Sequence, residues 1–336
     1  MIGSSPAPAA PGAAAAPRVA VVRALLAERV WLLVLLIVLT LIVQGAIVPG
    51  FLNGYNLLNT LQYGVEIGLL AIAETLVIIS GGGGIDLSVG SQVSLASIVL
   101  GVLVIRLHQD LWLSVAAVML LGLLMGAVNG GMVAYVGIPP LLATLGTMYV
   151  YSSLALVLTG GIPVSGFPPE FFGIGQGTAV GIPNQVLWIF LPVVVLLGLL
   201  AHRSVLGRHL FGVGANETAA RFAGIDVRAV RFWVYVVAGF LAALGAVIMT
   251  SRVATAKPDA GLGYELRAIT VAVLGGTDIF GGRGSVAGTV MAILLITLLS
   301  NGLDLAMVHP IWQVGMLGAV LIAGVLLNNW TAARQR

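Results

Sequence analysis

Two glutamates inside an apolar run are the residues of this sequence with the clearest chemical potential. Glu66 and Glu74 lie eight residues apart within 57–79, a run long enough to cross a membrane as one helix. That spacing places both carboxylates on one broad helical face. An ionisable side chain at membrane depth is costly unless it is paired or hydrated, so this face is expected to point into the bundle. We interpret it as the wall of a water-filled pathway for a polar solute; the alternative is a buried pair, such as a glutamate with Arg267.

The other polar residues at or near membrane depth are uncharged. We add Asn129 and Asn301 to Glu66 and Glu74 as pathway candidates, because an amide hydrogen-bonds to the hydroxyl groups of a solute without binding an ion. The same amides are equally explained as hydrogen-bonding contacts between helices.

The sequence contains few residues suited to catalysis or to metal binding. The chain has no cysteine and four histidines, which leaves no thiolate nucleophile and few ligands for zinc. No nucleophile is accompanied by a base, so a membrane enzyme is the least favoured class, and no cofactor is expected on this chain. Carboxylates and histidines do not form the intramembrane series typical of a proton relay, which weakens the case for a secondary carrier.

Two glycine-rich segments interrupt the apolar runs. Residues 81–91 read GGGGIDLSVGS and residues 275–289 read GGTDIFGGRGSVAGT. Neither has the Lys followed by Ser or Thr of a nucleotide-binding loop, so any ATP must be hydrolysed by another chain. Glycine allows a left-handed backbone and close approach, which predicts either a gate or a tight interhelical turn. The residues assigned to this motif are Gly84, Asp86, Ser88, Gly90, Ser91, Gly281, Gly282, Gly284 and Ser285.

Two local packing predictions accompany these segments. Asp86 is expected either to cap a helix that begins near Leu87 or to bind an arginine across a cytoplasmic interface. Gly122, Gly126 and Gly130 are spaced by four residues and offer a small-residue face for close packing within the fold, with contact to a second copy as the alternative.

The elements that position these residues are predicted to be membrane-spanning helices. Of 336 residues, 59% are hydrophobic and 8% charged, and the mean hydropathy is +1.10, more apolar surface than a soluble fold can bury. Because backbone groups in lipid must be satisfied within their own segment, we predict an all-α polytopic membrane protein of about ten spans, with a possible internal repeat and broken helices. The predicted spans are 31–48, 57–79, 91–105, 113–133, 141–158, 186–200, 232–249, 266–274, 286–299 and 314–327.

Charge distribution predicts the topology. With the N-terminus inside, most basic residues fall on the cytoplasmic side, which places both termini in the cytoplasm. Residues 1–17 are predicted to be a disordered tail, residues 18–330 a single transmembrane domain and residues 331–336 a C-terminal tail. The longest cytoplasmic segment is 202–228, which is either a docking site for a partner or an ordinary basic loop. The basic residues assigned to the inside are Arg18, Arg23, Arg29, Arg203, Arg208, Arg221, Arg228, Arg231, Arg283, Arg334 and Arg336.

Three ordered motifs resemble one known family. GGIDLSVGS at 83–91, GRHLFGVGANETAARFAGI at 207–225, and GGTDIFGGRGSVAGT at 275–289 followed by LLSNGLDL at 298–305 are similar to the membrane permease subunits of bacterial ABC monosaccharide importers, the ribose, xylose and arabinose group. The resemblance covers about 57–327, nearly the whole chain outside the N-terminal tail. It implies a multi-pass permease of the bacterial inner membrane that imports a pentose, hexose or related polyol.

The resemblance also implies partners. They are an ATP-binding subunit that holds ATP and Mg²⁺, an identical or homologous permease, an extracytoplasmic sugar-binding protein and the lipid of the membrane, with no nucleic acid. In this family, the counterpart of 202–228 couples the permease to the ATPase. The residues that the resemblance assigns to ATPase coupling are Gly207, Arg208, Gly212, Asn216, Ala219, Ala220, Ala223 and Gly224.

Two alternatives to this function stay open at the level of sequence. A secondary carrier working alone would transport without an ATPase and would tolerate changes in 207–225. An ABC permease for branched amino acids or nucleosides would share the ATPase dependence and differ only in its cargo.

Overall fold

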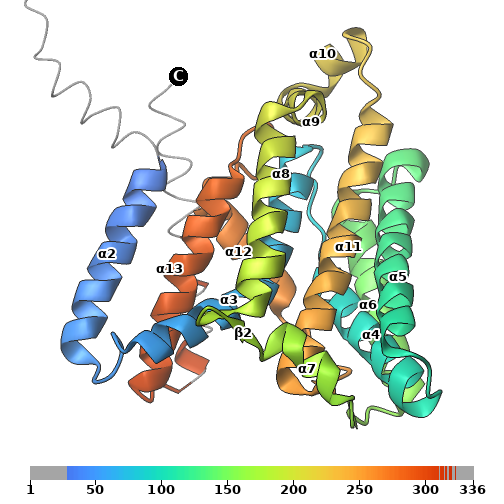
Figure 1. Cartoon of the computed structure of the whole chain (residues 1–336). Helices are drawn as coiled ribbons and strands as arrows, with labels where there is room; N and C mark the ends of the chain where they lie inside the picture. The colour runs from blue at the N-terminus through green and yellow to red at the C-terminus, as the bar shows by residue number, and fades with distance from the viewer. Residues whose placement is uncertain (1–28, 310, 314, 316–317, 320–321, 323–336) are drawn as a thin grey trace, which may run out of the picture.

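The computed structural model describes residues 29–309, 311–313, 315, 318–319 and 322 (Figure 1). The predicted tails at 1–17 and 331–336 and most of the predicted span 314–327 lie outside these residues. The helices are α2 (Arg29–Ile47), α3 (Gly54–Ile79), α4 (Val89–Gly101), α5 (Leu111–Gly131), α6 (Pro140–Thr159), α7 (Pro169–Gly175), α8 (Leu191–Arg203), α9 (Val205–Ala215), α10 (Glu217–Phe222), α11 (Val227–Val253), α12 (Tyr264–Leu274) and α13 (Val286–Leu305).

Short π-helical and strand segments complete these elements. The π-helical segment η1 (Val102–Arg106) extends α4, η2 (Met132–Val136) extends α5, and η3 (Gln185–Phe190) precedes α8. Two antiparallel strand pairs follow: β1 (Val164–Ser165) with β4 (Thr255–Ala256), and β2 (Thr178–Ala179) with β3 (Ile182–Pro183).

The prediction of an all-α polytopic membrane protein is confirmed. Within the described residues, seven helices are long and apolar enough to cross a membrane: α3, α4 with η1, α5 with η2, α6, α8 with η3, α11 and α13. A shorter apolar helix covers Trp31–Ile47. The number of ten membrane spans stays a prediction.

The two short predicted spans have different outcomes. Residues 91–105 belong to a helix that η1 extends to Val89–Arg106, which is long enough to cross. Residues 266–274 belong to α12, whose 11 residues extend only about 16 Å, roughly half of the hydrocarbon thickness. The pattern of helix, glycine-rich turn and helix therefore occurs twice, as α3 followed by α4 and as the half-length α12 followed by α13.

Helices α3, α4 and α11 form the core, and α8 lies mostly at the surface of the chain. The predicted small-residue face of α5 packs on α11: a Cβ at Gly126 would meet the Tyr235 carbonyl, and one at Gly122 would meet Gly239. The prediction of packing within the fold is thus confirmed, because only glycine lets the two backbones approach this closely.

The predicted cytoplasmic segment 202–228 and the connection between α6 and α8 lie at opposite ends of the bundle. Figure 1 shows α9 and α10 at one end and α7 with β2 at the other. We call these the α10 end and the α7 end. Asp226 caps the first turn of α11 at the α10 end by accepting from Ala229 N at 3.0 Å, and β4 pairs with β1 just beyond the far end of α11.

Candidate functional site

A polar cavity of about 270 Å³ lies between α3, α11, α12 and α13. It extends from Asp304, near the α7 end of α13, to Ile293, about 10 Å from the other end of that helix. Its mixture of aromatic, amide, hydroxyl and charged groups suits a small polar solute. The polar residues that line it are Thr60, Tyr63, Arg252, Tyr264, Arg267, Thr297, Ser300, Asn301, Asp304 and Gln313.

Glu66 is held beside this cavity by an ion pair with Arg252. Arg252 Nε donates to Glu66 Oε1 at 2.7 Å, and the guanidinium carbon lies 4.8 Å from the centre of the Tyr63 ring. Glu66 is buried, and its second oxygen, Oε2, has no hydrogen-bond partner in the described part of the chain. The sequence-based alternative of a buried pair therefore has the right chemistry but the wrong partner: Arg252 takes the place expected for Arg267.

Asn301 lines the cavity and also joins two helices. Its Nδ2 donates to Asn56 Oδ1 at 3.0 Å, and Asn56 Nδ2 donates back to Asn301 Oδ1 at 2.8 Å. This reciprocal amide pair connects the first turn of α3 to the last turns of α13. Both interpretations of Asn301 from the sequence, solute-facing amide and helix contact, are compatible with its position.

Asp86 is the centre of a separate, fully buried network. Its Oδ1 accepts from the backbone N and the Oγ of Ser88 at 2.9 and 2.6 Å, and its Oδ2 accepts from Asn129 Nδ2 at 3.2 Å and Gln92 Nε2 at 3.4 Å. Of the two roles predicted for Asp86, the helix cap is wrong, and the arginine across an interface stays a prediction. Ser88 occupies the N-cap position of α4, and no arginine in the described residues pairs with Asp86.

Glu74 and Asn129 belong to this network and do not line the polar cavity. Glu74 Oε2 accepts from Asp86 N at 3.3 Å, and Asn129 Oδ1 accepts from Thr147 Oγ1 at 2.8 Å. The network thereby ties α3, the first glycine-rich turn, α4, α5 and α6 together. The four pathway candidates thus separate into two that lie at the cavity and two that hold the turn.

The two glycine-rich turns meet the end of α9 in a contact that we call the glycine joint, made of Gly81, Gly214, Gly281 and Gly282. Gly282 N donates to Ile79 O at 3.0 Å. A Cβ at Gly214 would lie 2.5 Å from Gly282 N and would overlap Ile79 O, and a Cβ at Gly281 would lie 2.5 Å from the Gly81 Cα. Backbone therefore packs directly on backbone, and Gly81, Gly281 and Gly282 have positive φ that favours glycine.

The remaining residues of the predicted gate or turn motif serve local structure. Ser285 caps α13 by accepting from Gly288 N at 3.2 Å, and Ser91 Oγ donates to Ser88 O at 2.8 Å. A Cβ at Gly90 would overlap Gly261 O, and one at Gly284 would lie 2.7 Å from Ile79 Cδ1. Gly84 N donates to Gly81 O at 3.1 Å within the first turn.

The predicted coupling loop forms α9 and α10 at the α10 end of the molecule. Among the coupling residues that the resemblance assigned, Gly207 and Ala220 are buried, so they can support the loop but cannot present a surface to another protein. Gly212 is half-buried. The exposed members of the set are Arg208, Asn216, Ala219, Ala223 and Gly224.

Sequence reasoning missed two residues of these sites. Phe222 ends α10 with 89% of its surface exposed, beside the exposed coupling residues. Its signal was a large apolar side chain within 216–224, a stretch of otherwise small or polar residues. Arg252 follows the predicted span 232–249 and is absent from the predicted pathway set, although a cation just beyond the end of a span is a natural partner for a buried glutamate at similar depth.

The tip of this loop is held by Glu217. It accepts from Arg221 at 2.5 Å and from Arg231 at 2.7 Å. Burial acts to raise the pKa of Glu217, but the hydrogen bonds and charges of Arg231 and Arg221 outweigh it and hold the pKa below its usual value of 4.5. A depressed carboxylate pKa stabilises the folded loop above the unfolded pKa, and this contribution is lost as the pH falls through the folded pKa.

We therefore expect α10 to be more protected from hydrogen exchange in the native chain than in Glu217→Gln, by roughly two- to fivefold at pH 7, because exposed pairs contribute little. The difference should shrink as the pH falls below the usual carboxyl pKa of 4.5 and vanish below the lowered pKa of the folded state. Pulsed hydrogen exchange with mass spectrometry on the segment Glu217–Phe222 measures it. Equal protection of the two proteins at pH 7 would show that the pairs do not order the tip.

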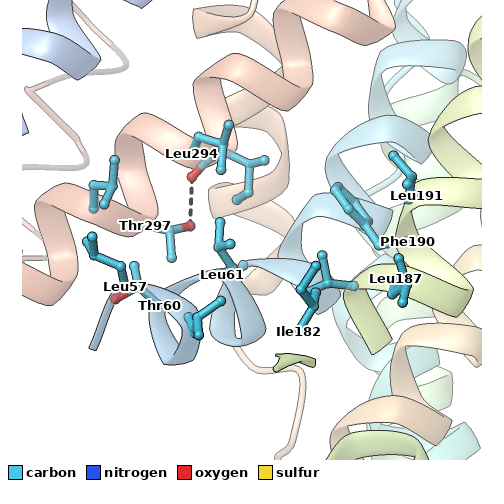
Figure 2. A pocket seen from close by; sticks show the side chains of 14 residues that line it. Leu57, Thr60, Leu61, Ile182, Leu187, Phe190, Leu191, Leu294 and Thr297 are labelled. Atoms are coloured by element: carbon cyan, nitrogen blue, oxygen red, sulfur yellow. Dashed lines mark hydrogen bonds between the residues drawn. The ribbon is translucent and has the colours of Figure 1, made fainter. Parts of the chain in front are cut away.

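A second cavity, of about 500 Å³, is almost entirely apolar. Figure 2 shows it between α3, α13 and the η3 end of α8, with Leu61, Ile182 and Phe190 among its walls. Its two hydroxyls are already used within their own helices: Thr60 Oγ1 donates to Asn56 O at 2.7 Å and Thr297 Oγ1 to Ile293 O at 2.6 Å. It offers no free polar group, so a hydroxylated solute is better served by the smaller polar cavity.

In the described part of the chain, no three residues among His, Asp and Glu are grouped closely enough to hold a metal ion.

Comparison with known proteins identifies the family. Residues 56–325 match the family model described as branched-chain amino acid transport system / permease component. The chain belongs to this permease family. No solved structure matches the chain significantly.

Individual relatives of this permease cover nearly its whole length. It is 38% identical over 309 residues to the autoinducer 2 import system permease protein LsrD of Enterobacter sp. (strain 638), covering 90% of this chain and 93% of the relative. It is 36% identical over 311 residues to the ribose import permease protein RbsC of Escherichia coli (strain K12), covering 91% and 95%. It is 39% identical over 294 residues to RbsC of Bacillus subtilis (strain 168), covering 87% and 90%.

These matches confirm the resemblance seen in the three motifs. They also confirm that the permease is a transport component and not an enzyme. The two relatives named for ribose and the one named for autoinducer 2 do not favour the alternatives of a lone carrier or an amino-acid permease.

Proposed function

We propose that this chain is the membrane permease subunit of an ATP-driven importer that carries a monosaccharide across the bacterial inner membrane. The observation that supports it most is the match to ribose import permeases over about nine tenths of both chains. The polar cavity supports it independently, because its hydroxyl, amide and charged groups fit a neutral polyhydroxylated solute better than an apolar side chain.

The proposal includes the partners of such an importer. A separate ATPase subunit with ATP and Mg²⁺ would dock at the α10 end, a sugar-binding protein at the α7 end, and an identical or homologous permease alongside. Both termini would then be cytoplasmic. The polar cavity, with Glu66 and Asn301, would form the outer part of the translocation pathway, and the glycine joint would connect that pathway to the docking loop.

ATP-dependent uptake in liposomes tests this function. The permease, its ATPase subunit and the binding protein are reconstituted, and uptake of labelled ribose is measured while unlabelled pentoses, hexoses, polyols and branched amino acids compete. We expect uptake only with ATP and all three components, and competition by sugars but not by amino acids. Uptake without the ATPase would favour a lone carrier, and competition by leucine alone would favour an amino-acid permease.

The docking site is tested by Phe222→Ala. An exposed aromatic side chain at the tip of a docking loop is a strong anchor, so we expect its removal to weaken ATPase binding at least about tenfold. Val180→Ala is the matched control, because Val180 is 97% exposed but lies in the strand-bearing segment near the α7 end. Affinity is measured by titrating labelled permease in detergent with the ATPase subunit. Equal affinity of Phe222→Ala and the native chain would remove the α10 tip from the interface.

A further inference from the structure

The polar cavity is lined by an arginine that forms no ion pair within the described residues. Arg267 is an exposed residue of α12, about 10 Å along the helix axis from its last residue, Leu274. Its guanidinium forms none of the ion pairs in the described residues, which are Glu217 with Arg221 and Arg231, and Glu66 with Arg252. A free guanidinium at membrane depth must face water or a polar ligand, since hydrocarbon would not solvate it.

A carboxylate also lines the same cavity, in the last turn of α13. Asp304 lines the cavity and accepts from Gln313 Nε2 at 2.6 Å through Oδ1. No ion pair in the described residues neutralises it. The cavity thus presents one unpaired five-donor guanidinium and one acceptor carboxylate, in addition to Tyr264. A carboxylate can accept from one hydroxyl of a sugar while a guanidinium donates to another hydroxyl of the same sugar.

The other lining groups determine what the cavity can select. Arg252 is already engaged with Glu66, and Asn301 with Asn56, so neither is free to bind a charged ligand strongly. The Thr297 hydroxyl already donates a hydrogen bond to the backbone carbonyl of Ile293 in the same helix. At about 270 Å³, the cavity lies just below the range typical of drug-sized ligands, which suits a single sugar ring.

We infer that this cavity is a monosaccharide-binding subsite of the permease itself, in which Arg267 and Asp304 recognise different hydroxyls of one sugar and Tyr264 offers a ring face. This inference rests on the proposed function for its class of solute. Its consequence is that part of the sugar selectivity resides in this chain and not only in a separate binding protein. The site is open to water and is expected to bind sugar with low affinity. It therefore selects among sugars by hydrogen bonding rather than by tight enclosure.

Binding to the permease alone tests the subsite. Saturation-transfer NMR with D-ribose and 2-deoxy-D-ribose is measured on the full chain in detergent, with neither ATPase nor binding protein present. We expect a ribose signal that is about tenfold weaker in affinity for Arg267→Gln and for Asp304→Asn, because each removes a charge-assisted hydrogen bond. Arg106→Gln and Glu170→Gln are matched controls, since neither residue lines the cavity, and they should bind ribose as the native chain does.

The deoxy sugar keeps the test decisive if the variants do not fold. On the native chain, 2-deoxy-D-ribose should bind several-fold more weakly than ribose, because it lacks one of two neighbouring hydroxyls. No ribose signal, equal binding of both sugars, or equal loss in the control variants would overturn the subsite. Such a result would leave ATP-dependent uptake intact and the proposed function standing, because uptake is measured separately.

Discussion

Arg252→Ala should lower the apparent melting temperature of the purified permease sharply and abolish uptake. The substitution leaves Glu66 buried with no counter-ion, and its Oε2 already lacks a hydrogen-bond partner in the described part of the chain. Breaking a buried pair by removing one partner costs about 3–5 kcal/mol, because the remaining charge is uncompensated. Fluorescence-detected size-exclusion chromatography after heating measures the loss.

The neutral double variant separates charge from packing. In Glu66→Gln with Arg252→Gln, no buried charge is left unpaired, so most of the stability should return. Arg106→Ala is the matched control, because Arg106 also lies near the α7 end but bonds only to the carbonyls of Leu158 and Thr159. A single Arg252→Ala variant that melts like the native chain would show that the pair is not structural. Normal uptake by the double variant would remove the pair from the pathway.

Gly214→Ala should uncouple ATP hydrolysis from uptake. A Cβ at Gly214 overlaps Ile79 O and lies 2.5 Å from Gly282 N, so α9 must move away from both glycine-rich turns. The tip formed by α10 does not take part in this contact, so the ATPase subunit should still bind. Because typical coupling between sites is worth 5–150-fold, we expect uptake per ATP hydrolysed to fall about tenfold or more.

A second glycine provides the control for this effect. A Cβ at Gly198 in α8 meets nothing within 4 Å, so Gly198→Ala should leave coupling unchanged. ATP hydrolysis and sugar uptake are measured on the same proteoliposomes. If Gly214→Ala retains the native ratio, the glycine joint does not carry the motion of the docking loop to the turns.

The polar residues show what could be predicted from the sequence and what could not. Glu66 was expected to face the interior because a charge in lipid is costly, and it does. Glu74 is buried as the same rule predicts and lies on the same helical face. It nevertheless accepts a hydrogen bond from Asp86 N and does not line the polar cavity. Spacing along one helix cannot distinguish these outcomes, because the partners of the two residues come from other segments of the chain.

The membrane class, most helices and the family could be predicted, because hydropathy, helix length and three ordered motifs are local properties of the chain. The pairing of Glu66 with Arg252 instead of Arg267, and the enclosure of Asp86 by α4 and α5, follow from the packing of the helices. The same packing brings Gly81, Gly214 and Gly281 into one joint. Glu66 and Arg252, and likewise Gly81 and Gly281, are more than a hundred positions apart in the sequence. The geometry of these contacts depends on how the helices pack rather than on any one segment.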